Sequence, residues 1–367
     1  SCVCGKGFTV MTIGLSTGLA ILSFILVIGP LIFFHELGHF LVARLFKIKV
    51  EEFGIGYPPR MLTLFERNGT KYTLNWLPLG GFMRPAGEGD PTVEGGFDAA
   101  SRLARFSTLF AGPAANIVIA FVLLLVMFML GAPEEQPGAL VTLVEPDSPA
   151  EIAGLEPGDV IIEADGVFIE TYDDLREYIF ANTGEDVVLT VRRNEAFVDL
   201  TLTPRTEWPE GQGPTGIQMQ PIVEIQRYGP FRATGRAFQE MGNIMVAFVE
   251  LPSLIAQNQI PTRYLRPVSV IGISQMGGQA MEASLSQAAA WPIIQLTALI
   301  SLALAITNLL PIPALDGGRI LFVLIETIRG KRISPEREAV VHFVGFALLV
   351  TAMIAFMYLD IVDPLIQ

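Results

Sequence analysis

Cysteine, histidine and charge are all scarce in this chain of 367 residues. The two cysteines, Cys2 and Cys4, stand in the first four positions, which excludes a disulfide scaffold. Only 17% of the residues are charged, whereas 51% are hydrophobic and the mean hydropathy is +0.49. Soluble globular proteins carry about 25% charged residues, so this composition excludes that class. The chain is predicted to be an integral membrane protein.

Four stretches lack Asp, Glu, Lys and Arg altogether, namely residues 7–34, 106–133, 283–315 and 339–359. Each is longer than the roughly 20 residues that a helix needs to cross a bilayer, so we expect four transmembrane helices. An even number places both termini on one side. The first stretch is too long for a cleavable signal peptide and runs directly into a polar motif, although Met11 could be the true start.

Basic residues indicate the orientation. Nine Lys and Arg lie in residues 44–105 and five in residues 316–338, so these shorter connections are predicted to be cytoplasmic. Residues 131–290 carry 23 of the 37 acidic residues against nine basic ones. We expect this acidic segment to be extracytoplasmic, and its charge argues against nucleic acid as a partner.

Two segments are predicted to be β-rich. Asn68-Gly69 separates strand-like runs at 50–66 and 71–77, which predicts a hairpin on the cytoplasmic side, closed by a turn at 77–81. Residues 138–205 contain two capping-box patterns, Ser148 to Glu151 and Thr171 to Asp174, between strand-like runs. They predict a compact β-rich module with two short helices. The region after it contains a mixed helical pattern at 230–258, which favours an interfacial amphipathic helix.

His35, Glu36 and His39 form the pattern HExxH at the end of the first charge-free stretch. Residues four apart share a helix face, so both imidazoles can bind one tetrahedral zinc ion. Bound zinc lowers the pKa of water to about 7, and Glu36, one position round the helix, is placed as the general base. The pattern uses two of only three histidines in the chain, and it predicts metal-dependent hydrolysis at the membrane.

A catalytic zinc ion needs a third protein ligand. The two cysteines lie at the far end of the first span, about 45 Å of helix away, which leaves His342 and Asp316 as candidates. We favour Asp316 because two prolines before it end or kink the third span, and a carboxylate at membrane depth needs a cation. Two alternatives stay open: Asp316 could pair with Arg319, and His342 could be a hydrogen-bonded structural residue.

Four motifs in order carry a family resemblance: HExxH in the first span, Gly112-Pro113-x-x-Asn116 in the second, a string from Asp147 to Asp159 that resembles the core of a bacterial PDZ domain, and Asn308-x-x-Pro-x-Pro-x-Leu-Asp316-Gly317. Together they resemble the site-2 protease family, specifically the bacterial branch similar to the regulator of sigma-E protease. The best-known members of that branch have two PDZ domains, and this sequence has one such unit.

The resemblance implies zinc bound by His35, His39 and Asp316, Glu36 as the general base, and Asn116 and Asn308 as residues that position the substrate. It implies an intramembrane zinc endopeptidase of the cell (cytoplasmic) membrane that performs regulated intramembrane proteolysis. Its partners would be membrane lipid, an upstream site-1-type protease that makes a first extracytoplasmic cut, and single-span substrates such as anti-sigma-factor-like regulators or remnant signal peptides. The 50–77 sheet would receive the unwound substrate as an added strand.

The predicted fold class is therefore a multi-pass α-helical membrane protein with four transmembrane helices, an inserted β-rich PDZ domain and a small membrane-associated β-sheet. The predicted order is span one with HExxH (1–46), sheet and loop (47–104), span two (105–131), PDZ domain (138–205), linker and interfacial helix (206–285), span three with the Leu-Asp-Gly motif (288–318) and span four (338–359). A catalytically silent PDZ-bearing scaffold and a metal transporter remain alternative functions.

Overall fold

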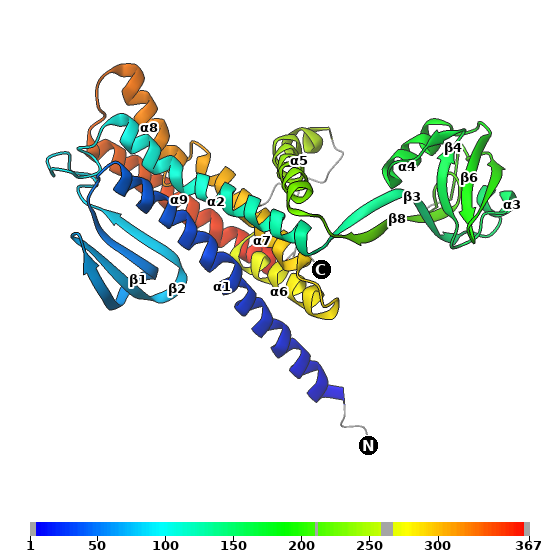
Figure 1. Cartoon of the computed structure of the whole chain (residues 1–367), viewed down its shortest axis with the longest axis horizontal. Coiled ribbons are helices and arrows are strands. Elements are labelled where there is room, and N and C mark those ends of the chain that lie inside the picture. The colour runs from blue at the N-terminus through cyan, green and yellow to red at the C-terminus, as the bar shows by residue number, and fades with distance from the viewer. Residues whose placement is uncertain (1–4, 210–211, 258–266, 363–367) are drawn as a thin grey trace. The chain divides into compact units, whose positions relative to one another are not determined.

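The computed structural model describes residues 5–209, 212–257 and 267–362. The chain forms two compact units, one made of Ser1–Leu130 with Tyr228–Gln367 and the other of Gly131–Arg227. Within the described residues, four helices are long and apolar enough to cross a membrane (Figure 1): α1 (Gly5–Leu45), α2 (Arg102–Leu130), α7 (Trp291–Leu309) and α9 (Pro335–Val362). The prediction of four spans is confirmed.

Small residues allow α1 and α2 to lie in close contact. A Cβ on Gly38 would stand 2.4 Å from the Ala111 carbonyl oxygen and 2.8 Å from the Ala115 methyl group. On its other side α2 packs against α7, where the Ser301 hydroxyl donates to the Asn116 carbonyl oxygen at 2.8 Å. In lipid the hydrophobic effect does not drive helices together, so van der Waals contacts from close packing of this kind stabilise the helix pairs.

A sheet of two long strands follows α1. The strands β1 (Val50–Arg67) and β2 (Thr70–Pro85) are joined by Asn68 and Gly69 with φ of 51° and 75°, the positive values that a type I′ hairpin requires. The sequence predicted that a turn at 77–81 closes the sheet. This prediction is wrong, because β2 continues to Pro85 and pairs with β1 again. At Gly80, with φ of 82°, β2 turns back along the other edge of β1, so that Gly54 is paired with both Thr73 and Phe82. No local sequence pattern predicts the pairing of residues 81–85 with β1.

One apolar cluster joins the elements around HExxH. It contains Phe40 and Ala43 of α1, Phe53 of β1, Leu109 of α2 and Ile320 of α8 (Asp316–Arg329). The Phe40 and Phe53 rings lie 4.6 Å apart between centroids. Burial of each large side chain contributes about 2 kcal/mol, so this cluster fixes α8 against α1.

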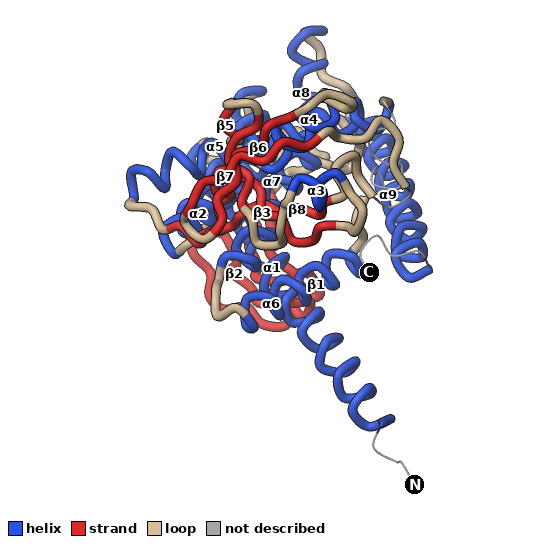
Figure 2. The backbone as a smooth tube through the Cα atoms, turned by 90° about the vertical axis from the view of Figure 1, so that its right-hand side faces the viewer, coloured by secondary structure: helices blue, strands red, loops and turns tan. Residues whose placement is uncertain are grey.

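The second unit is a sheet with two short helices. Its strands, drawn in red in Figure 2, run in the order β7-β6-β4-β3-β8, with β5 paired to β4. The elements are β3 (Ala132–Val144), α3 (Pro149–Ala153), β4 (Val160–Ala164), β5 (Val167–Phe168), α4 (Tyr172–Ala181), β6 (Val187–Arg193), β7 (Ala196–Leu202) and β8 (Ile217–Gln226). Both helices have the predicted caps, in which Ser148 accepts from the Glu151 amide and Thr171 forms a reciprocal box with Asp174. The prediction of an inserted β-rich domain is confirmed.

The predicted bounds 138–205 are too narrow for this domain. The strands β3 and β8 pair from Ala132 with Gln226 to Val144 with Ile217, so the domain reaches into the predicted linker at 206–285. Strands that pair across such a distance leave no local signal in the sequence. Both strands also contain proline, which argues against a strand when only the sequence is known.

The described part of the remaining predicted linker contains two helices. It contains α5 (Pro230–Ala256), which continues through Pro252, and α6 (Val270–Ser286), which packs against α1 and which the sequence did not predict. The predicted third span, 288–318, is also too long. Its helix α7 ends at Leu309, and Asp316 is the first residue of α8.

Candidate metal centre

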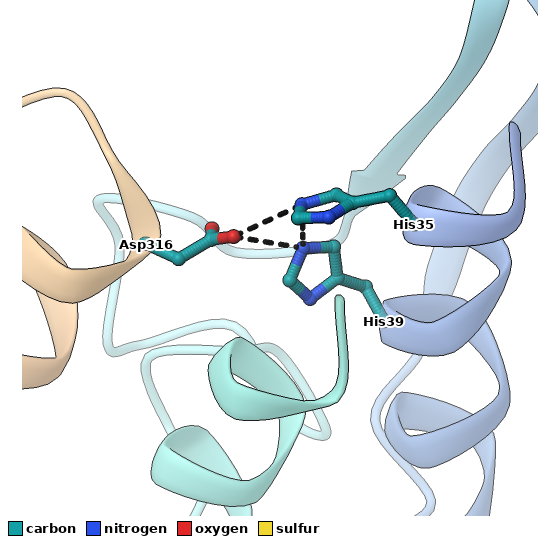
Figure 3. A group of neighbouring side chains, drawn as sticks. All are labelled: His35, His39 and Asp316. Atoms are coloured by element: carbon teal, nitrogen blue, oxygen red, sulfur yellow. Dashed lines mark hydrogen bonds and ion pairs between the residues drawn. The ribbon is translucent and has the colours of Figure 1, made fainter. Parts of the chain in front are cut away.

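Three side chains from distant parts of the chain converge on one point. His35 and His39 project from α1 toward Asp316 at the start of α8 (Figure 3). The Asp316 Oδ2 atom lies 3.0 Å from His35 Nε2 and 3.3 Å from His39 Nε2, and the two nitrogens are 3.1 Å apart. Among the residues described, this is the one group of three His, Cys, Asp or Glu side chains that meets the spacing of a metal site.

These distances fit a zinc ion. Ligand atoms about 2.0–2.1 Å from a tetrahedral zinc ion stand about 3.3 Å from one another. The three donor atoms form a triangle with edges of 3.0 to 3.3 Å, close to one face of that tetrahedron. Two imidazoles and a carboxylate are also a donor set that a catalytic zinc ion takes, with its fourth position left for water or substrate.

The hydrogen bonds of His39 fix its tautomer. His39 Nδ1 lies 2.7 Å from the Thr108 carbonyl oxygen, which can only accept. The ring proton therefore resides on Nδ1, and the lone pair of Nε2 faces the other donor atoms. A metal-binding histidine is commonly held by such a bond to a backbone carbonyl. Thr108 carries no motif that would have revealed this role in the sequence.

The Asn116 side chain fixes the tautomer of His35 in the same way as the Thr108 carbonyl group fixes that of His39. Its side chain is fully buried, and its amide group lies 3.2 Å from His35 Nδ1. The Asn116 Oδ1 atom has no hydrogen-bond partner as the amide is placed. Rotating the amide by 180° brings that oxygen to Nδ1, where it accepts the ring proton and leaves the Nε2 lone pair for a metal. Asn116 thus lies against His35, whereas the family resemblance implied contact with the substrate.

Gly112 makes room for both imidazoles. A Cβ at this position would stand 2.2 Å from His39 Nε2 and 2.7 Å from His35 Nε2. The close neighbours of Gly112 are thus the candidate metal-binding rings themselves. No side chain larger than hydrogen fits between α2 and this site.

Glu36 borders a cavity of about 220 Å³ together with His39, Asp316 and Phe82. Arg319 also lines the cavity, but its guanidinium pairs with Glu88 at 2.5 Å. The alternative in which Asp316 pairs with Arg319 is therefore wrong, because Asp316 faces the two histidines instead. The cavity gives Glu36 a space that water can enter.

A buried ion pair holds α8 in place. The Glu326 carboxylate accepts from Arg105 of α2 at 2.5 Å and from Arg102 at 3.3 Å. Burial acts to raise the pKa of Glu326, but the hydrogen bond and charge of Arg105, together with Arg102 and Arg332, outweigh it and lower the pKa below its usual range. The pair ties α8, and with it Asp316, to the helix that carries Gly112 and Asn116.

The other predicted residues lie elsewhere. Asn308 is half-buried, and its amide donates to the Leu304 carbonyl oxygen of its own helix at 2.9 Å. His342 accepts a hydrogen bond from the Ala314 backbone N–H at 2.8 Å and is not among the three converging side chains. The alternative of His342 as a hydrogen-bonded residue agrees with this placement.

Comparison with known proteins decides the family. The model of peptidase family M50 matches residues 23–352, which include all three converging side chains. The chain belongs to peptidase family M50. The predicted family resemblance and the prediction of a metallopeptidase are thereby confirmed.

Curated relatives match this M50 peptidase over nearly its whole length. A protein of Clostridium acetobutylicum whose name includes zinc metalloprotease is 31% identical, covering 93% of this chain and 97% of the relative. The zinc metalloprotease RasP of Geobacillus kaustophilus is 28% identical, again covering 93% of this chain and 97% of that protein. A solved PDZ domain of the SdrC-like protein from Listeria innocua is 26% identical over 23% of this chain and 93% of its own, with a TM-score of 0.20.

Proposed function

We propose that this M50 peptidase is a zinc endopeptidase that cleaves single-span membrane proteins within or next to the bilayer. The observation that carries the proposal is the convergence of His35, His39 and Asp316, with edges of 3.0 to 3.3 Å, beside a cavity that Glu36 lines. His35 and His39 lie in an apolar helix long enough to span a membrane. A hydrolytic centre in that setting suits substrates that are themselves membrane helices.

The residues of the site have three different roles in the proposed hydrolysis: metal binding, proton transfer and orientation of the imidazoles. His35, His39 and Asp316 would hold the zinc ion, which supplies Lewis-acid chemistry that polarises a carbonyl group and lowers the pKa of water. Glu36 accepts the proton of the attacking water and passes it to the leaving amine nitrogen. Thr108 and Asn116 keep both imidazoles in the tautomer that offers Nε2, which orients the donor set before substrate arrives.

The second half of β2 is the proposed docking edge for the substrate. Residues 81–85 pair with β1 on one side, and within the described sheets no strand pairs with their other edge. Phe82, Met83 and Pro85 line the same cavity as Glu36. A helix hides its carbonyl groups, so a substrate must unwind, and an extended segment added to this edge would present its backbone to the site. The sequence placed the substrate-binding edge in the sheet at 50–77, whereas this proposal places it at residues 81–85 of β2.

Charge supports an orientation for the protein. The basic connections that precede α2 and α9 favour a cytoplasmic position for the site in the cytoplasmic membrane. The acidic unit Gly131–Arg227 would then be an extracytoplasmic PDZ domain. We propose that it meets substrates whose outer part a site-1-type protease has removed, and that anti-sigma-factor-like regulators or remnant signal peptides are the substrate classes.

Cleavage of a single-span peptide by the purified protein in detergent tests the proposal. Wild type should cut the peptide, a zinc chelator should stop the reaction, and Glu36→Gln should lower the rate by at least about 100-fold because the proton acceptor is lost. Glu94→Gln is the matched control, because Glu94 is exposed and is not among the residues that line the cavity. Equal cleavage by wild type and Glu36→Gln would show that the peptidase chemistry proposed here is wrong.

A further inference from the structure

The turn that leads into Asp316 has an unfavourable backbone. Ala314, two residues before Asp316, has φ of 76°, in the left-handed region that an L-residue with a Cβ avoids. Pro311 and Pro313 lie in the same turn and have no backbone N–H to donate. Such a conformation persists only where neighbouring groups hold it. The position of the Asp316 carboxylate depends on whatever holds this turn.

His342 of α9 supplies one such contact. Its Nδ1 atom accepts the hydrogen bond of the Ala314 N–H at 2.8 Å. Because that backbone group can only donate, the lone pair of the neutral ring is on Nδ1 and its proton is on Nε2, which faces the Glu338 carboxylate at 3.9 Å. The imidazole also lies against the Phe322 ring of α8, 5.4 Å between centroids. His342 therefore contacts both the turn and the helix that follows it.

Gly345 supplies a second contact from the same face of α9. Residues three apart are neighbours on a helix surface, so Gly345 lies beside His342. A Cβ on Gly345 would stand 2.3 Å from the Pro313 Cβ atom and 3.0 Å from its carbonyl carbon. Only 6% of the apolar window of α9 is buried, against 33% to 39% for the other three spans. The contact with residues 313 and 314 is thus one of the few that this span makes.

We propose that His342 is a positioning residue, which fixes the Ala314 backbone and through it the direction from which Asp316 reaches the metal. The inference rests on the proposed zinc function. It assigns to the third histidine a role that is neither that of a ligand nor that of a catalytic residue, since His342 contacts neither His35, His39 nor Asp316 in the described hydrogen bonds.

Zinc affinity of the full-length protein in detergent, measured by competition with a chromogenic chelator, tests the role. His342→Ala should bind zinc about 10-fold more weakly, the low end of the effect of removing a group that orients a ligand. His342→Asn should stay near wild type, because its amide oxygen stands as many bonds from the backbone as Nδ1 and can accept from Ala314. His342→Gln, whose oxygen stands one bond further out, should lose affinity like the alanine variant.

Two further measurements separate positioning from a general loss of structure. The visible spectrum of the cobalt-substituted protein should change in His342→Ala and not in Phe343→Ala, a control on the same helix whose side chain is exposed. Ala314→Gly in the His342→Ala background should recover most of the lost affinity, because glycine adopts a positive φ without help.

The outcomes are distinct. Zinc affinity and a cobalt spectrum unchanged in His342→Ala would overturn the positioning role, and so would equal losses in His342→Asn and His342→Gln. If His342→Ala does not fold, the comparison of the asparagine and glutamine variants decides alone. A wild-type protein that binds no zinc or cuts no peptide would instead refute the proposed function, which the cleavage assay tests independently of any change at His342.

Discussion

Gly112→Ala should destroy the metal site while leaving the helices formed. The new methyl group would stand 2.2 Å from His39 Nε2, whereas ordinary contacts begin at about 3.4 Å, so the imidazole must retreat by about 1 Å. His35 faces the same group at 2.7 Å and must move as well. Metal–ligand distances tolerate about 0.2 Å, so both rings would leave their bonding positions.

We expect the substitution to lower zinc content and peptidase activity strongly and to change the helix content little. A misplacement of 1 Å costs about 100-fold in rate even where all groups remain present, and here two metal-binding side chains move together. Alanine is the better helix former by about 1 kcal/mol, so α2 gains local propensity. We expect the purified variant to retain its circular dichroism spectrum, to contain less than about one tenth of the wild-type zinc and to cut a single-span peptide at least 100-fold more slowly.

Gly242→Ala is the matched control. Gly242 also lies within a helix, and a Cβ there would meet no atom within 4 Å. It should keep wild-type zinc content and activity. If Gly112→Ala bound zinc with wild-type stoichiometry and affinity, the placement of α2 against the two imidazoles would be wrong, and with it the argument that this glycine belongs to the site.

Three further changes test other parts of the structure. Asn116→Ala should weaken zinc binding about 10-fold in chelator competition, because His35 loses the group that fixes its tautomer; unchanged affinity would refute that role. Glu326→Gln should lower the free energy of unfolding by about 3 kcal/mol, seen as a lower midpoint in detergent thermal melts, because it leaves the buried arginine of α2 uncompensated; an equal midpoint would contradict it. In the β-rich domain, burial acts to raise the pKa of Asp159, but hydrogen bonds from Arg193 and the Glu156 amide, together with the Arg193 charge, outweigh it and lower the pKa. The stabilisation is therefore complete above about pH 4 and lost as the pH falls below it. Protection of this domain's amides against hydrogen exchange, relative to the unfolded chain at the same pH, should fall in acid for wild type, and a wild-type acid response in Asp159→Asn would refute the assignment.

The sequence predicted those features that short stretches of chain determine. Charge-free runs identified the four spans, Asn68-Gly69 identified the hairpin, and the capping patterns at Ser148 and Thr171 identified both short helices. Each of these depends on residues within a few positions of one another. HExxH belongs to the same class, because its two imidazoles share a helix face through a spacing of four residues.

Features that depend on pairing between distant segments escaped prediction. The strand β8 pairs with β3 across some 80 residues, and the second half of β2 pairs with β1 only after a turn at Gly80. The same limit applies at the metal centre. Thr108 carries no chemical pattern in the sequence, yet its carbonyl group holds His39, and Asn116 was expected to meet the substrate rather than His35. Asp316 was found because two prolines and a carboxylate at membrane depth are unusual by themselves.

The placement of buried polar groups also separates a peptidase from a metal transporter. Away from the metal centre, the buried polar side chains of the described spans are Ser23, Arg105, Ser301 and Asp360. Ser23 donates to the Ala20 carbonyl oxygen of its own helix, and Ser301 of α7 donates to α2. Arg105 pairs with Glu326 of α8, and Asp360 accepts from the backbone N–H of Ser269, the N-cap of α6, so each of these groups has a partner within the helices. A cation that crossed the bilayer would need ligands at successive depths, since each unsolvated step is costly. Here the three proposed ligand atoms form one cluster, and the proposed general base Glu36 lies beside it. That arrangement favours hydrolysis at one site over the passage of an ion along several sites.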